Sequence, residues 1–135
     1  MIRKILQGGY LMKRLLVIGG DENGCSLISF LANYDEVEIV AVIDQNPNCP
    51  GIEMAKNYNI RTDVHWEHWL DQSIDLIIVT TNDQTILPHL RQNKPDHTYI
   101  IPTDISKIFM TLLNTITLER DNQQLILNNI GDGMI

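Results

Sequence analysis

Three short runs of almost purely apolar residues constrain the fold of this chain more than any other feature. They are residues 14–19 (RLLVIG), 37–44 (VEIVAVID) and 74–80 (IDLIIVT). Runs without polar alternation are typical of strands buried on both faces, as in a parallel sheet that is covered by helices. Two weaker strands are predicted at residues 60–64 and 99–101.

The segments between these strands have the apolar spacing of helices. Residues 25–32, 52–58 and 84–92 are predicted as helices and residues 65–70 as a shorter one, although Pro88 lies inside the third. Strands that alternate with helices indicate βαβ units with right-handed crossovers. We therefore predict an α/β, three-layer Rossmann-like fold, with a five-stranded parallel sheet in the order 3-2-1-4-5 and a long C-terminal helix.

The 135 residues divide into segments of different character. Residues 1–11 are expected to be a translated leader or a disordered tail, because Met12 and the residues after it have the pattern of a natural start that leads into a strand. Residues 12–104 form the predicted Rossmann-like nucleotide-binding domain, and residues 105–130 a C-terminal linker or dimerisation helix. A chain of this length suits one domain with one core.

The net charge of −7 argues against direct contact with nucleic acid, since proteins that bind it usually carry a basic face. The apolar runs are too short to span a membrane, and the start of the chain lacks the layout of a signal peptide. The two cysteines, Cys25 and Cys49, have no metal-type pairing and are expected to be reduced. We predict a cytoplasmic protein that contacts neither nucleic acid nor membrane.

Glycines follow the first predicted strand, where a nucleotide can bind beyond the carboxyl end of a parallel sheet. A tight turn there lets the backbone approach a pyrophosphate, and the following helix offers N–H groups to the anion. Asp44 ends the second strand, where a carboxylate can accept hydrogen bonds from an adenosine ribose. In the pattern G-x-G-x-x-G, Asp21 stands at the middle glycine, so a tight turn without a ligand remains the alternative.

We predict a small-molecule, nucleotide-like ligand at this turn, either NAD or another adenine nucleotide. Asp44 has no basic neighbour, which favours NAD over NADP. The fourth strand ends on the same edge, so its threonines are candidates for lining the far half of the ligand, and Asp83 is expected to cap the next helix. The predicted cofactor-binding residues are Gly19, Gly20, Asp21, Asn23, Gly24, Asp44, Thr80 and Thr81.

No catalytic residue and no metal ligand is predicted. His65 and His68 share a helical face, but a zinc site needs a further ligand, so the preferred interpretation has Trp66 and Trp69 packing inward and the histidines outward. At Cys25, a redox-sensitive thiol is the alternative to a small buried helix residue. The sequence has neither an evident Ser/His/Asp grouping nor a Tyr-x-x-x-Lys pair.

An apolar stripe at helical spacing runs through the C-terminal segment. Its first half is expected to pack on the sheet. Its second half is expected to project from the domain and pair with a second copy, giving a homodimer. The stripe consists of Ile105, Ile108, Phe109, Leu112, Leu113 and Ile116, and then Leu125, Ile126 and Ile130.

Two stretches resemble a known family. Residues 124–135 (QLILNNIGDGMI) resemble the opening of PAS sensory domains, and residues 40–62 (VAVIDQNPNCPGIEMAKNYNIRT) resemble Rossmann-type N-terminal input domains. Together they resemble the input domains of bacterial PAS-containing signalling proteins, the sigma-54-dependent transcriptional activators and sensor histidine kinases. The resemblance implies that residues 131–135 start a truncated PAS-like domain.

The resemblance implies a regulatory input domain of a transcriptional regulator or sensor kinase, so we expect a segment that senses an adenine nucleotide or dinucleotide and is not an enzyme. Kinase or ATPase activity would belong to other modules of such a protein. Two alternatives stay open. One is the cofactor-binding domain of a small NAD-dependent oxidoreductase similar to dihydrodipicolinate reductase, and the other is a ligand-free structural dimerisation module.

Overall fold

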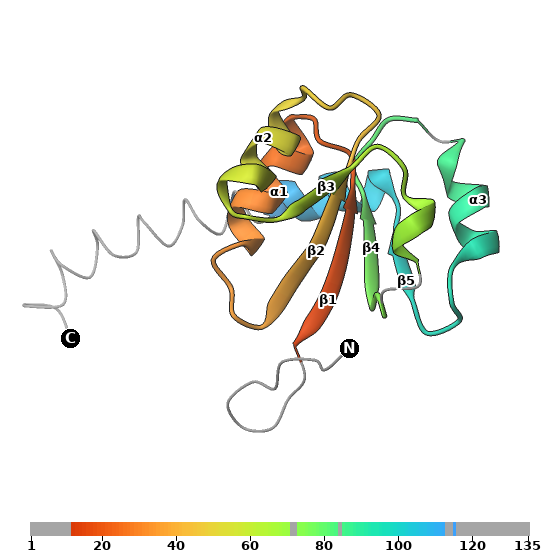
Figure 1. Cartoon of the computed structure of the whole chain (residues 1–135). Coiled ribbons are helices and arrows are strands. Elements are labelled where there is room, and N and C mark those ends of the chain that lie inside the picture. Colours follow the sequence, from red (N-terminus) through yellow and green to blue (C-terminus); the bar gives the residue numbers. More distant parts are fainter. Residues whose placement is uncertain (1–11, 71–72, 84, 113–114, 116–135) are drawn as a thin grey trace, which may run out of the picture.

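Five parallel strands form one sheet in the computed structural model, which describes residues 12–70, 73–83, 85–112 and 115. Their order is β3-β2-β1-β4-β5 (Figure 1). This confirms the predicted α/β Rossmann-like fold and its strand order. The strands are β1 (Lys13–Ile18), β2 (Val37–Ile43), β3 (Arg61–Asp63), β4 (Leu76–Val79) and β5 (Tyr99–Ile101).

Strand β1 is the centre of the sheet, and its side chains from Arg14 to Ile18 are buried. It pairs with β2 on one side and with β4 on the other. Strand order therefore reverses at β1. In open parallel sheets, ligands bind at such a switch point, in the crevice beyond the carboxyl ends of the strands. The sheet thus places one candidate position for a site, after Ile18 and Val79, which are direct neighbours in the register.

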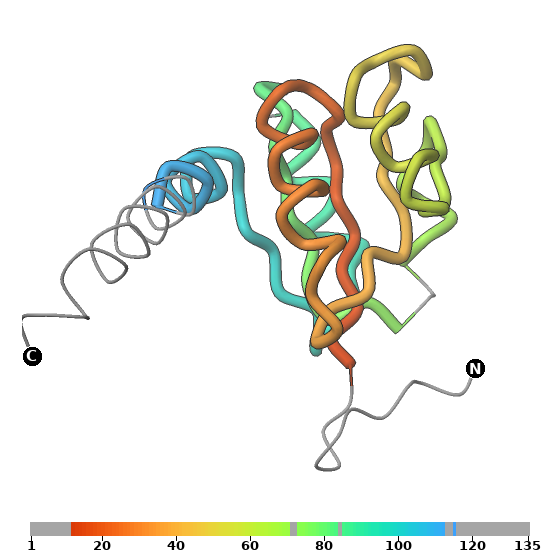
Figure 2. Tube along the Cα trace, turned by 90° about the vertical axis from the view of Figure 1, so that its left-hand side faces the viewer, coloured from red at the N-terminus to blue at the C-terminus, as the bar shows by residue number. Residues whose placement is uncertain are grey.

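Helices cover both faces of the sheet. Helix α1 (Glu22–Leu31), α2 (Pro50–Asn57) and the helical residues 103–112 lie side by side on one face, as Figure 2 shows. Helix α3 (Ile86–Asn93) and a 3-10 turn, η1 (Glu67–Trp69), lie on the other (Figure 1). Each layer buries its own apolar cluster. One is built around Val17, Leu27, Ile52 and Met110, and the other around Leu16, Ile77, Leu87 and Leu90.

The C-terminal helix presents the opposite face from the one predicted. Ile105, Ile108, Phe109 and Leu112 are exposed, so the prediction that the first half of the apolar stripe packs on the sheet is wrong. Its buried residues are Thr103, Ser106 and Met110.

Two hydroxyls explain this orientation. Thr103 Oγ1 donates to the Thr81 carbonyl at 2.5 Å, and Ser106 Oγ donates to the Val79 carbonyl at 2.7 Å. These carbonyls follow or end a buried strand and need donors, because a buried carbonyl without one is costly. The hydroxyls therefore turn the helix toward β4, and Met110 is the one residue of the described part of the helix that enters the apolar cluster beneath α1.

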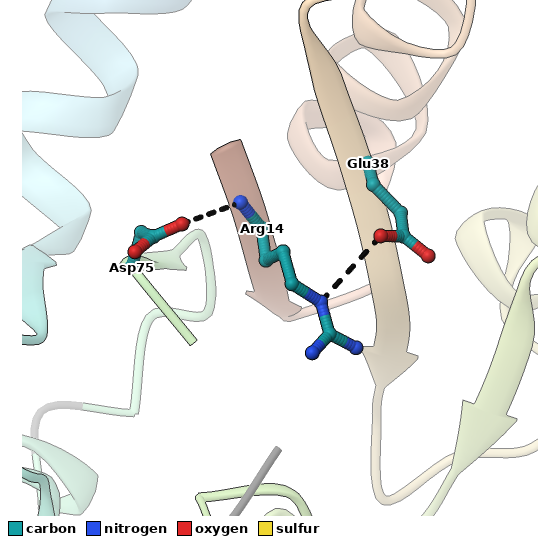
Figure 3. Close-up of polar contacts among 3 residues, drawn as sticks. All are labelled: Arg14, Glu38 and Asp75. Carbon is teal, nitrogen blue, oxygen red and sulfur yellow. Dashed lines mark hydrogen bonds and ion pairs between the residues drawn. The ribbon is translucent and has the colours of Figure 1, made fainter. Parts of the chain in front are cut away.

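The amino-terminal edge of the sheet is held by a buried arginine on β1. Arg14 is only 3% exposed, and its Nε lies 3.5 Å from a Glu38 carboxylate oxygen on β2 (Figure 3). Its backbone N–H donates to the Asp75 carboxylate at 2.8 Å, just before β4. Buried arginines are rarely found without such partners. Arg14 therefore ties three neighbouring strands together at the edge that lies opposite the candidate site.

Several predictions fall outside the described residues. The leader or tail at residues 1–11, most of the linker or dimerisation helix and the PAS-like residues 131–135 are among them. The homodimer through the C-terminal helix stays a prediction. Within the part of the chain that the structure describes, no helix is both long enough and apolar enough to cross a bilayer.

Candidate functional site

The turn after β1 begins with a residue that has to be glycine. Gly19 has a φ of +119°, a backbone conformation that L side chains rarely adopt. A Cβ there would overlap Thr80 Oγ1 and would lie 2.7 Å from the Thr81 nitrogen. The Thr80 hydroxyl donates to the Gly19 carbonyl at 2.9 Å. Gly19 therefore brings the carboxyl ends of β1 and β4 into direct contact.

Helix α1 starts three residues earlier than the predicted start at Cys25. Asp21 is its N-cap, and the side-chain oxygen Oδ1 accepts a hydrogen bond from the Gly24 N–H at 3.1 Å. Aspartate is among the strongest N-cap residues, since its carboxylate satisfies an N–H that has no partner within the helix. Gly24 consequently lies in the first helical turn, where a Cβ would overlap the Gly19 carbonyl oxygen.

The start of α2 covers the second glycine of the turn. The Gly51 N–H donates to the Gly20 carbonyl at 2.7 Å, and a Cβ on Gly20 would overlap Cys49 Sγ. Cys49 is buried, and burial raises the pKa of its thiol, so the thiol is protonated at neutral pH. The open space beside Gly20 is thus filled by the protein itself.

Asp44 joins the turn to the second strand. Its Oδ2 accepts from the Gly20 N–H at 2.7 Å and its Oδ1 from the Asn46 N–H at 2.8 Å. A carboxylate has about four lone-pair positions, so each oxygen can accept a further hydrogen bond. Asp44 is half-buried and held in one orientation, as a ligand-binding carboxylate has to be.

A cavity of about 470 Å³ opens beyond the carboxyl ends of β1, β2 and β4, on the side of the sheet where α3 lies. This volume is within the range of small-molecule sites. Its acidic residues are Asp44, Glu67 and Asp83, and hydrogen bonds from Thr85 hold the pKa of the Asp83 carboxyl below its usual value. The lining consists of Ile18, Gly19, Ile43, Asp44, Gln45, Val64, His65, Trp66, Glu67, Thr81, Asp83, Thr85, Ile86, His89 and Asn93.

The structure separates the predicted cofactor-binding residues into three groups. Gly19, Asp44 and Thr81 line the cavity. Thr80 is fully buried and holds the turn through its hydroxyl. The remaining four, Gly20, Asp21, Asn23 and Gly24, form the turn and the first turn of α1. For all eight residues, a role in binding stays a prediction.

The segment after β3 contributes lining residues that the sequence did not suggest. Asp63, the last residue of β3, accepts hydrogen bonds from the His65 N–H at 3.2 Å and from Trp69 Nε1 at 3.0 Å. The His65 N–H and then the Trp69 ring N–H hold the pKa of Asp63 below its usual value. Trp66 and Trp69 pack on the apolar cluster and the histidines are exposed, as predicted. The available signal was that this segment follows a strand at the same edge of the sheet.

The residues that the structure describes contain no group of three His, Cys, Asp or Glu side chains placed to hold a metal ion. The His65 and His68 rings lie with their centroids 6.3 Å apart. Asp83 accepts from the Thr85 N–H at 3.0 Å and from the Thr85 hydroxyl at 2.6 Å, immediately before α3. These contacts order the loop after β4 on the cavity rim.

Comparison with known proteins identifies solved structures of similar fold. A protein from Desulfitobacterium hafniense described as an NADPH-dependent oxidoreductase has a TM-score of 0.56 at 14% identity, over 67% of this chain and 26% of its own. GenD2 from gentamicin A biosynthesis, in complex with NAD, has a TM-score of 0.54 at 18% identity, over 68% of this chain and 26% of its own. A myo-inositol dehydrogenase from Lactobacillus casei, in complex with NAD(H) and myo-inositol, has a TM-score of 0.52 at 21% identity, over 67% of this chain and 28% of its own.

These similarities concern the fold. The fold is Rossmann-like. The chain spans about a quarter of the length of these structures. No protein-family model matches the chain, and a search of curated proteins finds no match either.

The comparisons correct two predictions. The resemblance to PAS-containing signalling input domains is contradicted, because the structural neighbours are NAD(P)-binding proteins. Of the two stretches that carried it, residues 40–62 run from within β2 through α2 into β3, a unit that Rossmann-like domains of any function contain. Residues 124–135 lie outside the described residues. The prediction that the segment is not enzymatic is contradicted by the same neighbours, which include proteins described as oxidoreductases and a dehydrogenase.

Proposed function

We propose that this domain binds a nicotinamide adenine dinucleotide and is the cofactor-binding part of an NAD-dependent oxidoreductase. The observation that carries the proposal is Asp44, a carboxylate at the end of β2 that lines the cavity and is oriented by two backbone N–H groups. The proposal takes up the oxidoreductase alternative, and the structural neighbours in complex with NAD support it.

Asp44 has the chemistry to recognise an adenosine ribose. The hydroxyls of a ribose diol are donors, and the carboxylate retains acceptor positions on both oxygens after bonding Gly20 and Asn46. A 2′-phosphate at the same place would meet the negative charge of Asp44, and no lysine or arginine lines the cavity in the part of the chain that the structure describes. The domain is therefore proposed to prefer NAD to NADP.

The remaining parts of the dinucleotide would follow the carboxyl edge of the sheet toward β4. Gly19 and Thr81 line the cavity there, and the β1–β4 switch point is where doubly wound sheets hold such ligands. When bound, the cofactor would supply hydride transfer. The substrate and the acid/base group of the reaction are not assigned to any residue of this chain.

Calorimetric titration of the protein with NAD and with its 2′-deoxyadenosine analogue tests the proposal. The wild type should bind NAD about tenfold more tightly than the analogue, since a hydrogen bond to a charged group contributes about 1.5–3 kcal/mol. Asp44→Ala should lose this preference, and Asp35→Asn, an exposed carboxylate at the opposite edge of the sheet, should retain it.

Comparing two ligands on the same protein separates ribose recognition from any loss of folded protein in Asp44→Ala. Absence of binding by the wild type at millimolar NAD would overturn the proposal. An equal preference for NAD in the wild type and in Asp44→Ala would remove Asp44 from the ribose contact.

A further inference from the structure

The turn after β1 carries its own anion at the place where a dinucleotide has its phosphates. In the G-x-G-x-x-G pattern, the middle glycine lets the backbone approach the pyrophosphate. This chain has Asp21 there, and its carboxylate caps α1 through the Gly24 N–H at 3.1 Å. The N-terminal end of a helix attracts negative charge, so the Asp21 carboxylate already lies where the helix would attract the phosphates.

A second carboxylate acts on the same turn. The Gly20 N–H donates to Asp44 Oδ2 at 2.7 Å. Two backbone N–H groups of the turn, those of Gly20 and Gly24, are thus bonded to side-chain carboxylates of the protein itself. The turn offers fewer donors to a pyrophosphate than its glycines suggest.

Among the described residues, the surroundings add no lysine or arginine in compensation. Residues 19–25 contain no lysine or arginine, and none lines the adjoining cavity in the part of the chain that the structure describes. The cavity instead carries Asp44, Glu67 and Asp83. These acidic groups would therefore repel a diphosphate that enters this site, whereas a nucleoside without phosphate carries no charge for them to repel.

We propose that Asp21 is a specificity-determining residue that weakens the binding of the diphosphate and leaves recognition of the nucleoside unchanged. This inference rests on the proposed binding of NAD. Asp21 stabilises α1 by capping it and, by the same contact, places a negative charge beside the phosphates. The site consequently disfavours phosphate charge, and the Asp21 carboxylate lowers its affinity for NAD.

Asp21→Asn separates the charge from the cap, because asparagine caps helices about as well as aspartate. We expect the Kd for NAD to fall about tenfold in Asp21→Asn, the size of the effect of one partly screened unit charge nearby. The Kd for adenosine should stay within about twofold, since adenosine carries no charge. Glu22→Gln is the matched control, because Glu22 is an exposed acid of the same helical turn.

Ionic strength supplies a readout that a purely structural role of Asp21 would not change. Raising the salt to about 1 M shortens the screening length to about 3 Å, so the advantage of Asp21→Asn for NAD should shrink. Calorimetry of wild type, Asp21→Asn and Glu22→Gln with NAD and adenosine, at low and high salt, measures both effects.

The outcomes distinguish this inference from the proposed function. If NAD binds the wild type and Asp21→Asn equally, or binds the variant more weakly, Asp21 does not oppose the diphosphate and the inference fails while the proposed function stands. If neither protein binds NAD, both fail. A tenfold gain that is equal for NAD and adenosine would also overturn the inference, because charge would then not be the cause.

Discussion

Gly20 and Cys49 offer a direct test of how the turn after β1 is packed. A Cβ on Gly20 would overlap Cys49 Sγ, whereas its next nearest atoms, Ile52 N and Asp44 Oδ2, would lie 3.4 and 3.5 Å away. The latter two are tolerable separations. Gly20→Ala should therefore be destabilising because of one sulfur atom, and Cys49→Ala should remove the obstacle.

The expected free energies follow from this geometry. Overpacking a close-packed site costs about 1–3 kcal/mol, and replacing glycine by alanine returns about 0.4–1 kcal/mol through the unfolded chain. Gly20→Ala should then lose about 1–2 kcal/mol of unfolding free energy. Cys49→Ala should lose about 1 kcal/mol for one buried heavy atom. Cys49 is the N-cap of α2 but makes no side-chain capping bond, so no cap is lost.

The double variant Gly20→Ala/Cys49→Ala should be no less stable than Cys49→Ala alone, which implies a coupling free energy of about 1–2 kcal/mol. Gly51→Ala is the control, since its Cβ would lie 2.6 Å from Gly20 Cα and 2.8 Å from the Gly20 oxygen. These are backbone atoms, and trimming Cys49 cannot relieve them.

Urea denaturation of the single and double variants gives the four free energies of the cycle. The reasoning is refuted if Gly20→Ala is as stable as the wild type, or if Cys49→Ala leaves the cost of Gly20→Ala unchanged. Rescue of Gly51→Ala by Cys49→Ala would equally show that the contact is described wrongly.

Two further predictions concern the remainder of the domain. Hydrogen bonds lower the pKa of Asp63 in the folded state, so its contribution to stability is complete above its unfolded pKa of about 3.9 and is lost as the pH falls through the lower folded value. Urea denaturation between neutral and acid pH should show this loss in the wild type and a smaller one in Asp63→Asn; identical profiles would contradict it. On the C-terminal helix, Met110→Ala should cost about 2 kcal/mol or more, because Met110 is 4% exposed. Ile108→Ala, at a residue 58% exposed, should stay within about 0.5 kcal/mol, and a larger loss at Ile108 would reverse the assigned faces of the helix.

The strands were predictable because their signal is local. Residues 14–19, 37–44 and 74–80 are mostly apolar, and each overlaps the strand found there, with its ends shifted by at most two residues. The start of α1 was misplaced because the glycines were given more weight than Asp21. Aspartate strongly prefers the N-cap position, where its side chain accepts a hydrogen bond from the N–H three residues later, as Asp21 does from Gly24. This preference would have located the start of α1 correctly from the sequence.

The buried face of the C-terminal helix could not be read from its own residues. Apolar spacing favoured Ile105 and Ile108, but the carbonyls at the end of β4 required donors, which Thr103 and Ser106 supply. The cavity was hidden for a similar reason. His65 and His89 come from segments that are distant in the chain and meet only after the sheet has formed.

The central position of β1 has a consequence for how the protein is made. Its register partners in β4 lie about sixty residues further along the chain, as Leu15 and Leu76 show. At a synthesis rate of about 5–20 residues per second, one edge of β1 stays unpaired for roughly 3–12 s until β4 has been synthesised. Strand β2 is available much sooner, so the nascent chain first holds β1 through that side alone. During this interval the open edge is a template for pairing with other chains, and we expect expression yield to depend on translation speed and temperature more than the stability of the finished fold would suggest.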